Sequence, residues 1–129
     1  MRELTLATHG GTEMTDVTSR VQEVVSESGT ASGLCVVFVP HTTAAVTINE
    51  NGDPAVPRDI AASLERQVPL DAGYEHGEGN SAAHIKAALV GSSVTIPVEE
   101  GRLRLGAWQG IFFCEFDGPR QRRIWIQVK

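Results

Sequence analysis

The segment from residue 107 to 116 is the strongest constraint on the fold, because it is a β-strand pattern without a polar face. Successive side chains of a strand point to opposite sides, and both sets here are mostly apolar: Trp108, Gly110, Phe112, Cys114 and Phe116 on one side, and Gln109, Ile111, Phe113, Glu115 and Asp117 on the other. Such a strand is central and covered on both faces. We therefore interpret Trp108 as a core residue, with a stacking platform for a ligand as the alternative, and expect Gln109 and Glu115 to need polar partners.

Strand patterns occupy both ends of the chain, and helical patterns lie mostly between them. Strands are predicted at residues 3–8, 34–39, 44–48, 93–98, 102–105, 107–116 and 122–128, and helices from residue 15 or 16 to Gly29, from Asp53 and Pro54 to residue 68, and from residue 80 or 81 to 89. This order favours an α+β fold, a mainly antiparallel sheet packed with about three helices, over a doubly wound parallel fold. The 129 residues are expected to form one domain, 1–129.

Charge and hydropathy exclude several classes of protein. The net charge of −5 argues against nucleic-acid binding, which needs a broad basic surface. No apolar stretch approaches the roughly 20 residues that span a bilayer, and the N-terminus has no signal-type apolar segment. We therefore expect a cytoplasmic protein without a membrane partner. Cys35 and Cys114 lie in apolar strand patterns, which is typical of small buried residues rather than redox centres.

Three of the four histidines fall in two short polar clusters. His41, followed by Thr42 and Thr43, comes directly after the strand at 34–39, whereas His76 lies in a glycine-rich loop and His84 on the next helix. The eight-residue separation of His76 and His84 lets both converge with His41, and three neutral imidazoles leave an open position on zinc or a similar ion. Without a tight HxH or HExxH spacing, hydrogen-bonded loop histidines are the alternative.

Carboxylate and amide side chains lie near the same clusters. Glu50, Glu78 and Glu115 are candidates to orient an imidazole or to act as a general base. A solvated carboxylate is the alternative for the first two. Glu115 lies in the apolar strand at 107–116, which argues against a carboxylate that is merely exposed to solvent. Asn49 and Asn80 are placed to hold a substrate, with helix capping as the competing role of Asn80.

Three arginines crowd the last turn and strand. The planar fork of a guanidinium suits phosphate oxygens. Arg120 is the favoured anion ligand because it follows the turn into which Glu115 and Asp117 lead. For Arg122 and Arg123 two interpretations stay open, anion binding and protection of an edge strand against pairing.

Three segments together resemble the signatures of the YjbQ-like family, often labelled secondary thiamine-phosphate synthase. They are residues 41–51, residues 74–86, and residues 105–120, which include the specific runs Gly-Ala-Trp-Gln-Gly and Glu-Phe-Asp-Gly-Pro-Arg. The resemblance covers nearly the whole chain. Ala107 is a departure, because the family pattern usually has threonine or serine before the tryptophan.

The resemblance implies a compact α+β fold, a homotrimer with sites near subunit boundaries, a divalent metal in some members, and weak thiamine-phosphate synthase activity. That reaction joins hydroxymethylpyrimidine diphosphate to thiazole phosphate and releases pyrophosphate. Metal and arginine would neutralise the diphosphate charge. The alternative is a non-catalytic oligomeric protein that binds a phosphorylated metabolite or a metal.

These considerations assign expected roles to eleven residues. The metal ligands, for zinc or magnesium, are expected to be His41, His76 and His84; the phosphate-binding residues Arg120, Thr42, Thr43 and Asn80; and the catalytic residues Glu115, Glu50, Gln109 and Asn49. The expected partners are a small phosphorylated metabolite and two further copies of the chain.

Overall fold

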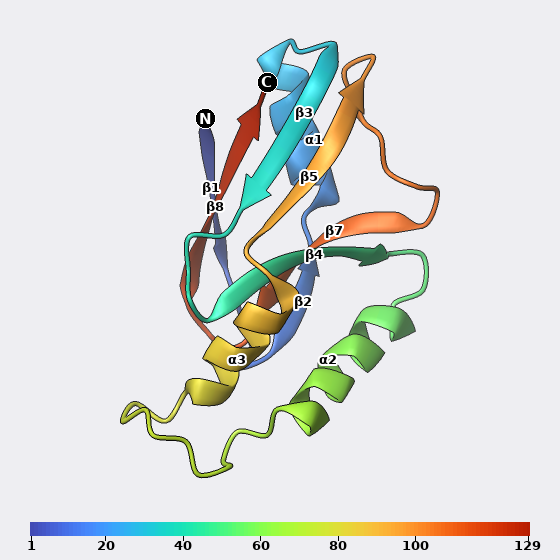
Figure 1. Ribbon diagram of the computed structural model, residues 1–129. Helices are drawn as coiled ribbons and strands as arrows, with labels where there is room; N and C mark the ends of the chain where they lie inside the picture. Colours follow the sequence, from blue (N-terminus) through green and yellow to red (C-terminus); the bar gives the residue numbers. More distant parts are fainter.

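Two antiparallel sheets and three helices make up the computed structural model, which describes residues 1–129 (Figure 1). The five-stranded sheet has the order β1 (Arg2–Ala7), β8 (Gln121–Val128), β3 (Ser32–Phe38), β5 (Ser93–Glu99) and β6 (Arg102–Leu103). The three-stranded sheet has the order β2 (Glu13–Asp16), β7 (Gln109–Glu115) and β4 (Ala44–Glu50). The predicted α+β class is confirmed.

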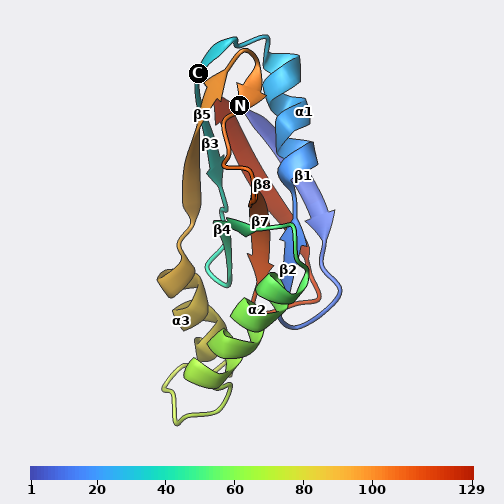
Figure 2. The ribbon, with the colours of Figure 1, turned by 90° about the vertical axis from the view of Figure 1, so that its right-hand side faces the viewer.

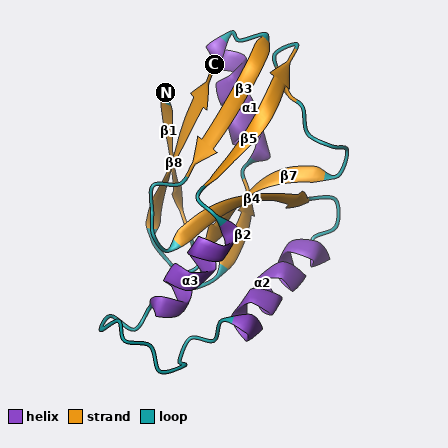
Figure 3. Ribbon diagram, in the orientation of Figure 1, coloured by secondary structure: helices purple, strands orange, loops and turns teal.

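The helices cover different parts of the two sheets (Figure 2, Figure 3). α1 (Thr18–Ser28) packs its buried valines against the five-stranded sheet and ends at Gly29, whose φ of 70° suits a residue without Cβ. α3 (Ser81–Val90) packs against the three-stranded sheet, and α2 (Ala55–Gln67) lies nearby with no fully buried residue. None of these helices combines the length and the apolar character needed to cross a membrane.

β7 is the central strand of the smaller sheet and is buried on both faces, as predicted. One face enters the main core beneath α1 and the larger sheet, and the other enters a smaller core against α3. The first face carries Ile111 and Phe113, and the second carries Phe112 and Cys114, which pack with Phe116, Ala83 and Ala87. Cys35 and Cys114 are both buried and free. This packing fixes the position of Glu115, the last residue of β7.

Trp108 is not a core residue, so that prediction is wrong. It is 68% exposed and lies in the turn before β7, which begins one residue later. Its ring covers Gly52, where a Cβ atom would lie 2.9 Å from the indole. Gln109 is exposed too, and its side-chain oxygen accepts a hydrogen bond from the Gly106 N–H at 2.7 Å. The apolar sequence pattern therefore starts before the strand does. Trp108 belongs to that pattern, but its ring packs over the backbone at Gly52 instead of entering the core.

Residues 13–16 form β2, where a helix was expected to begin at residue 15 or 16. Pairing with β7 from Glu13 opposite Glu115 to Asp16 opposite Phe112 holds this segment extended. Asp16 still serves the helix, because its carboxylate accepts hydrogen bonds from the Thr18 N–H and hydroxyl. Pairing with a strand that is distant in sequence therefore moves the start of the helix a few residues beyond the predicted position.

Candidate functional site

An open depression of about 480 Å³ gathers most of the predicted site residues. We call it the histidine–arginine depression. It is lined by Pro40, His41, Thr42, Thr43, His76, Glu78, Asn80, His84, Asp117, Arg120 and Arg122, and every one of these side chains except Pro40 is polar or charged. All three predicted metal ligands and all four predicted phosphate-binding residues are thus brought together.

Strand pairing explains why segments so distant in sequence meet here. Ala44, at the start of β4, lies opposite Glu115 at the end of β7, so Thr43 comes to the turn that leads into β8. β3 and β8 are neighbours in the larger sheet, which brings His41 next to Arg123. α3 packs against β4 and supplies the remaining wall through its first turn and the preceding loop.

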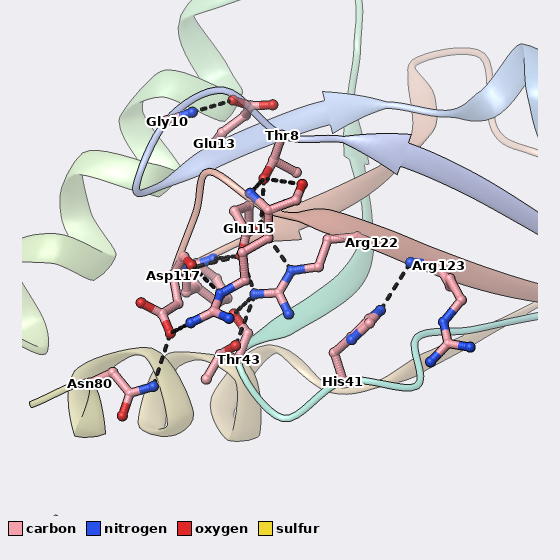
Figure 4. Close-up of polar contacts among 12 residues, drawn as sticks. Thr8, Gly10, Glu13, His41, Thr43, Asn80, Glu115, Asp117, Arg122 and Arg123 are labelled. Carbon is pink, nitrogen blue, oxygen red and sulfur yellow. Dashed lines mark hydrogen bonds and ion pairs between the residues drawn. The ribbon is translucent and has the colours of Figure 1, made fainter. Parts of the chain in front are cut away.

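A buried ion pair between Glu115 and Arg122 lies under the depression (Figure 4). The Glu115 carboxylate has no exposed surface, and the Arg122 side chain is 5% exposed. One carboxylate oxygen accepts from Arg122 Nε at 2.8 Å and from the Thr8 hydroxyl at 2.7 Å. The other accepts from Arg122 Nη2 and from the N–H groups of Phe116 and Asp117 at 3.1 and 3.0 Å. Five donors therefore saturate this carboxylate.

The surroundings of Glu115 keep it ionised. Burial raises the pKa of its carboxyl, but the hydrogen bonds from Arg122 and Thr8 outweigh burial and hold the pKa below its usual range. Gly118 closes the turn above it, because a Cβ there would lie 2.8 Å from both Glu115 Cγ and Thr8 Oγ1. A saturated carboxylate with a lowered pKa is a poor general base, so its geometry suits a positioning residue.

Arg122 is the functional residue that the sequence left undecided. β8 lies between β1 and β3, so the interpretation of Arg122 and Arg123 as charges on an edge strand is wrong. Nη2 of Arg122 donates to Thr43 Oγ1 at 2.8 Å as well as to Glu115. Nη1 has no hydrogen-bond partner, is not completely buried, and belongs to a side chain that lines the depression. The guanidinium is thus held on one side and open on the other.

Arg120 lies at the rim and is half exposed. Its Nε donates to the Asp117 carbonyl oxygen at 2.8 Å and its Nη2 to the Asp117 carboxylate at 2.9 Å. Burial raises the pKa of Asp117, but hydrogen bonds from Asn80 and Arg120 lower it below its usual range. Asn80 occupies the N-cap position of α3, yet its side chain makes no capping bond and leaves Oδ1 without a partner.

His41 carries a neutral imidazole. Burial lowers the pKa of its imidazole, and the positive charges of Arg122 and Arg123 lower it further. Nε2 accepts a hydrogen bond from the Arg123 N–H at 2.9 Å. Because a neutral imidazole carries one proton, that proton is on Nδ1.

His76 and His84 lie against each other with ring centroids 5.3 Å apart and planes at 88°. His76 Nε2 is 3.9 Å from a Glu78 carboxylate oxygen. The chain holds no group of three His, Cys, Asp or Glu side chains arranged to bind a metal ion. The three histidines therefore share a depression but do not fit a three-ligand metal site within one chain, partly because His41 Nε2 is already bonded.

Asn49, Glu50 and Gln109 are not brought to the depression. Asn49 lies opposite Gly110 and Glu50 opposite Gln109, at the far end of the β4–β7 ladder from Ala44 and Glu115. Five residue steps of a strand, from 44 to 49, span about 17 Å. Within one chain these three predicted catalytic residues form a separate group near the exposed Trp108.

The fold and the site define a small α+β domain with a polar depression built over a buried carboxylate–guanidinium pair. Comparison with known sequences is specific: the family model described as "UPF0047 protein YjbQ-like" matches residues 2–129. The chain belongs to this YjbQ-like family, which confirms the predicted membership.

Relatives and solved structures match this chain over most or all of its length. A UPF0047 protein of Methanocaldococcus jannaschii is 49% identical over 116 residues, covering 90% of this chain and 84% of the relative. UPF0047 protein YugU of Bacillus subtilis is 45% identical, covering 99% and 98%. A crystal structure of a YjbQ/UPF0047 family protein from Clostridium acetobutylicum has a TM-score of 0.98 and 50% identity, with both chains fully covered. A Sulfolobus solfataricus structure, described as a protein of unknown function, has a TM-score of 0.95 and 33% identity, covering 98% and 94%.

The ionised Glu115 predicts an acid-sensitive stability. At pH 7, Glu115→Gln is expected to lower the free energy of unfolding by about 3 kcal/mol, because Arg122 stays buried without its counter-charge. A lowered folded-state pKa contributes stability that is complete above the usual value of 4.5 and is lost as the pH falls through the folded pKa. The difference in the free energy of unfolding between wild type and variant, measured by urea unfolding, should therefore become smaller below about pH 4.5.

Glu99→Gln provides the matched control. Glu99 pairs with Arg104 at 3.0 Å, and both side chains are about 60% exposed. Its loss should lower the free energy of unfolding by less than about 0.5 kcal/mol at pH 7. An equal effect of the two substitutions would contradict the central role of the Glu115–Arg122 pair.

Proposed function

We propose that the histidine–arginine depression binds the phosphate of a small phosphorylated metabolite. The observation that carries this proposal is the Arg122 guanidinium, which is buried, held by Glu115 and Thr43, and open at Nη1. A donor fixed in advance loses little conformational entropy when an oxyanion binds. Arg120 at the rim and the Nδ1–H of His41 add donors suited to phosphate oxygens.

We propose a divalent ion, zinc or magnesium, as a co-ligand that enters together with phosphate. His76 and His84 offer two imidazoles, and Glu78 and Asp117 add carboxylates to the lining. Imidazoles suit zinc, and carboxylates suit magnesium. Because no three of these side chains are arranged as a ready site, ligands from phosphate and water would have to complete the coordination.

Phosphate binding is expected to depend on His76 and His84. Each of His76→Gln and His84→Gln should weaken binding of inorganic pyrophosphate about tenfold, the effect of losing roughly one charge-assisted hydrogen bond. Isothermal titration with and without 1 equivalent of zinc or magnesium measures this change. His9→Gln is the control, because His9 has an 86% exposed side chain outside the depression. Unmeasurable binding by wild type, or an equal loss in the control, would contradict the proposal.

We further propose that the chain is an enzyme with weak thiamine-phosphate synthase activity, as its family resemblance suggests. In that reaction the thiazole nitrogen bonds to the pyrimidine methylene carbon while the carbon–oxygen bond to the diphosphate breaks. Pyrophosphate carries away the electron pair, and no proton is removed from the attacking nitrogen. The reaction thus needs neutralisation of the leaving group more than a general base, which agrees with the saturated Glu115 carboxylate beneath the depression.

A turnover assay separates catalysis from binding. Wild type with both thiamine precursors and magnesium or zinc should release pyrophosphate, His84→Gln should release it at least tenfold more slowly, and His9→Gln should match wild type. The chain should also rescue a strain that lacks its main thiamine-phosphate synthase. If the ligand raises the melting temperature but neither pyrophosphate release nor rescue occurs, the non-catalytic binding protein is the correct reading.

We propose that the working form is a homotrimer. Large apolar side chains lie uncovered on the single chain, among them Leu34, Leu89 and Trp108 at 51%, 65% and 68% exposure. Contact between copies would bury such surface and stabilise the assembly. Sedimentation velocity at micromolar concentration should give three times the chain mass of 13.8 kDa, and a single monomeric species would rule the trimer out.

A further inference from the structure

Lys86 is a buried cation that lies outside the histidine–arginine depression. It belongs to α3, its side chain is 4% exposed, and its ammonium nitrogen donates to a Glu65 carboxylate oxygen at 2.7 Å. The ammonium also lies 5.5 Å from the centre of the Phe116 ring, in the smaller core. A buried charge is costly unless a partner of opposite charge compensates for it. The position of Glu65 is therefore coupled to that of Lys86.

Glu65 lies near the end of α2 and connects this helix to two other segments. The oxygen that accepts from Lys86 also accepts a hydrogen bond from the Thr12 hydroxyl, in the turn before β2. These two hydrogen bonds hold the pKa of the Glu65 carboxyl below its usual range, because both stabilise the ionised form. The carboxylate is therefore charged at neutral pH and pairs with the Lys86 ammonium.

α2 has few other anchors on the domain. None of its residues is fully buried, and its partly buried Leu64 packs against the smaller core. A helix with so little buried apolar surface gains little docking energy from packing. The ion pair between Glu65 and Lys86 is therefore an important contact between α2 and α3.

The loop that follows α2 carries His76 to the depression (Figure 1). Residues 69–79 connect α2 to the start of α3 and form neither helix nor strand. The path of such a loop depends on where its two ends are held. One end is α2, and the other is Asn80, whose side-chain amide donates to the turn after β7 at 2.9 Å. A displacement of α2 would therefore move His76.

We propose that Lys86 is a positioning residue for the histidine–arginine depression. Through Glu65 it holds α2 in place, and α2 sets the position of the loop that brings His76 against His84, with ring centroids 5.3 Å apart. Lys86 does not line the depression, so its effect on a ligand is indirect. This inference rests on the proposed phosphate-binding function and adds to it the residue that holds one wall of the site.

Hydrogen exchange tests the anchor without any ligand. In Lys86→Met an apolar side chain replaces the buried lysine, and Glu65, at 44% exposure, is left solvated. The melting temperature should therefore stay within about 3 °C of wild type. The amides of α2 should nevertheless exchange at least about fivefold faster, because the helix opens more often. Arg66→Met, which removes an exposed cation from the same helix, should leave this exchange unchanged. Exchange at the wild-type rate in Lys86→Met would overturn the anchor.

Double variants test the link to His76. In isothermal titration, Lys86→Met should weaken binding of inorganic pyrophosphate about fivefold. That loss should disappear in a His76→Gln background, because the imidazole that moves is already absent. It should persist in a His41→Gln background, since His41 lies between β3 and β4 and not on the loop after α2. Glu65→Gln should give the same pattern, which keeps the test decisive if Lys86→Met misfolds.

The outcomes separate this inference from the proposal beneath it. If wild type does not bind pyrophosphate, the phosphate site itself fails, and hydrogen exchange still decides whether Lys86 anchors α2. If wild type binds and Lys86→Met binds equally well, the positioning role is overturned. If Lys86→Met weakens binding to the same extent in the His76→Gln and His41→Gln backgrounds, Lys86 does not act through His76, and that link is overturned.

Discussion

The buried pair of Glu115 and Arg122 is the interaction on which the site depends. Moving two charges out of water is expensive, and their attraction offsets that cost only when hydrogen bonds satisfy the remaining atoms. Here the donors come from Thr8 after β1, from the backbone after β7 and from Arg122 on β8, while Thr43 before β4 holds the other side of the guanidinium. The pair therefore links four segments of the chain. Its main physical effect is to hold the positively charged Arg122 guanidinium in a fixed position under the depression.

The three-stranded sheet provides the rigid support for this pair. β7 has a core on each face, so its end is held by packing on two sides rather than by the loops that follow it. Loops then carry His41, His76, Asn80 and Arg120 over this fixed base, and α3 carries His84. Chemistry on loops above a rigid strand end is a common arrangement, because loops vary without disturbing the core. The same β7 burial that shapes the fold thus determines where the charges lie.

Local sequence patterns were sufficient for some features and not for others. The mostly apolar side chains on both faces of β7 correctly predicted a strand that is covered on both sides, since packing on both faces leaves a direct signature. β2 was missed because its four residues are extended only through pairing with β7. Arg122 was undecided because only strand order places it inside the sheet and opposite Glu115. Residue spacing also could not show that His41 Nε2 accepts a hydrogen bond from the backbone, and the three-histidine metal site stays a prediction.

The geometry of β4 limits which groups act on a ligand within one chain. Glu50 lies about 20 Å along the strand from Ala44, the first residue of β4, and the paired ladder with β7 cannot shorten that distance without breaking its hydrogen bonds. Glu115 is near but has no free lone pair for a proton. Proton transfer in a single chain would therefore fall to the imidazoles, of which His41 is neutral with its proton on Nδ1. A reaction that only expels an anionic leaving group needs no proton transfer, because fixed hydrogen-bond donors are sufficient to stabilise the charge on the departing group.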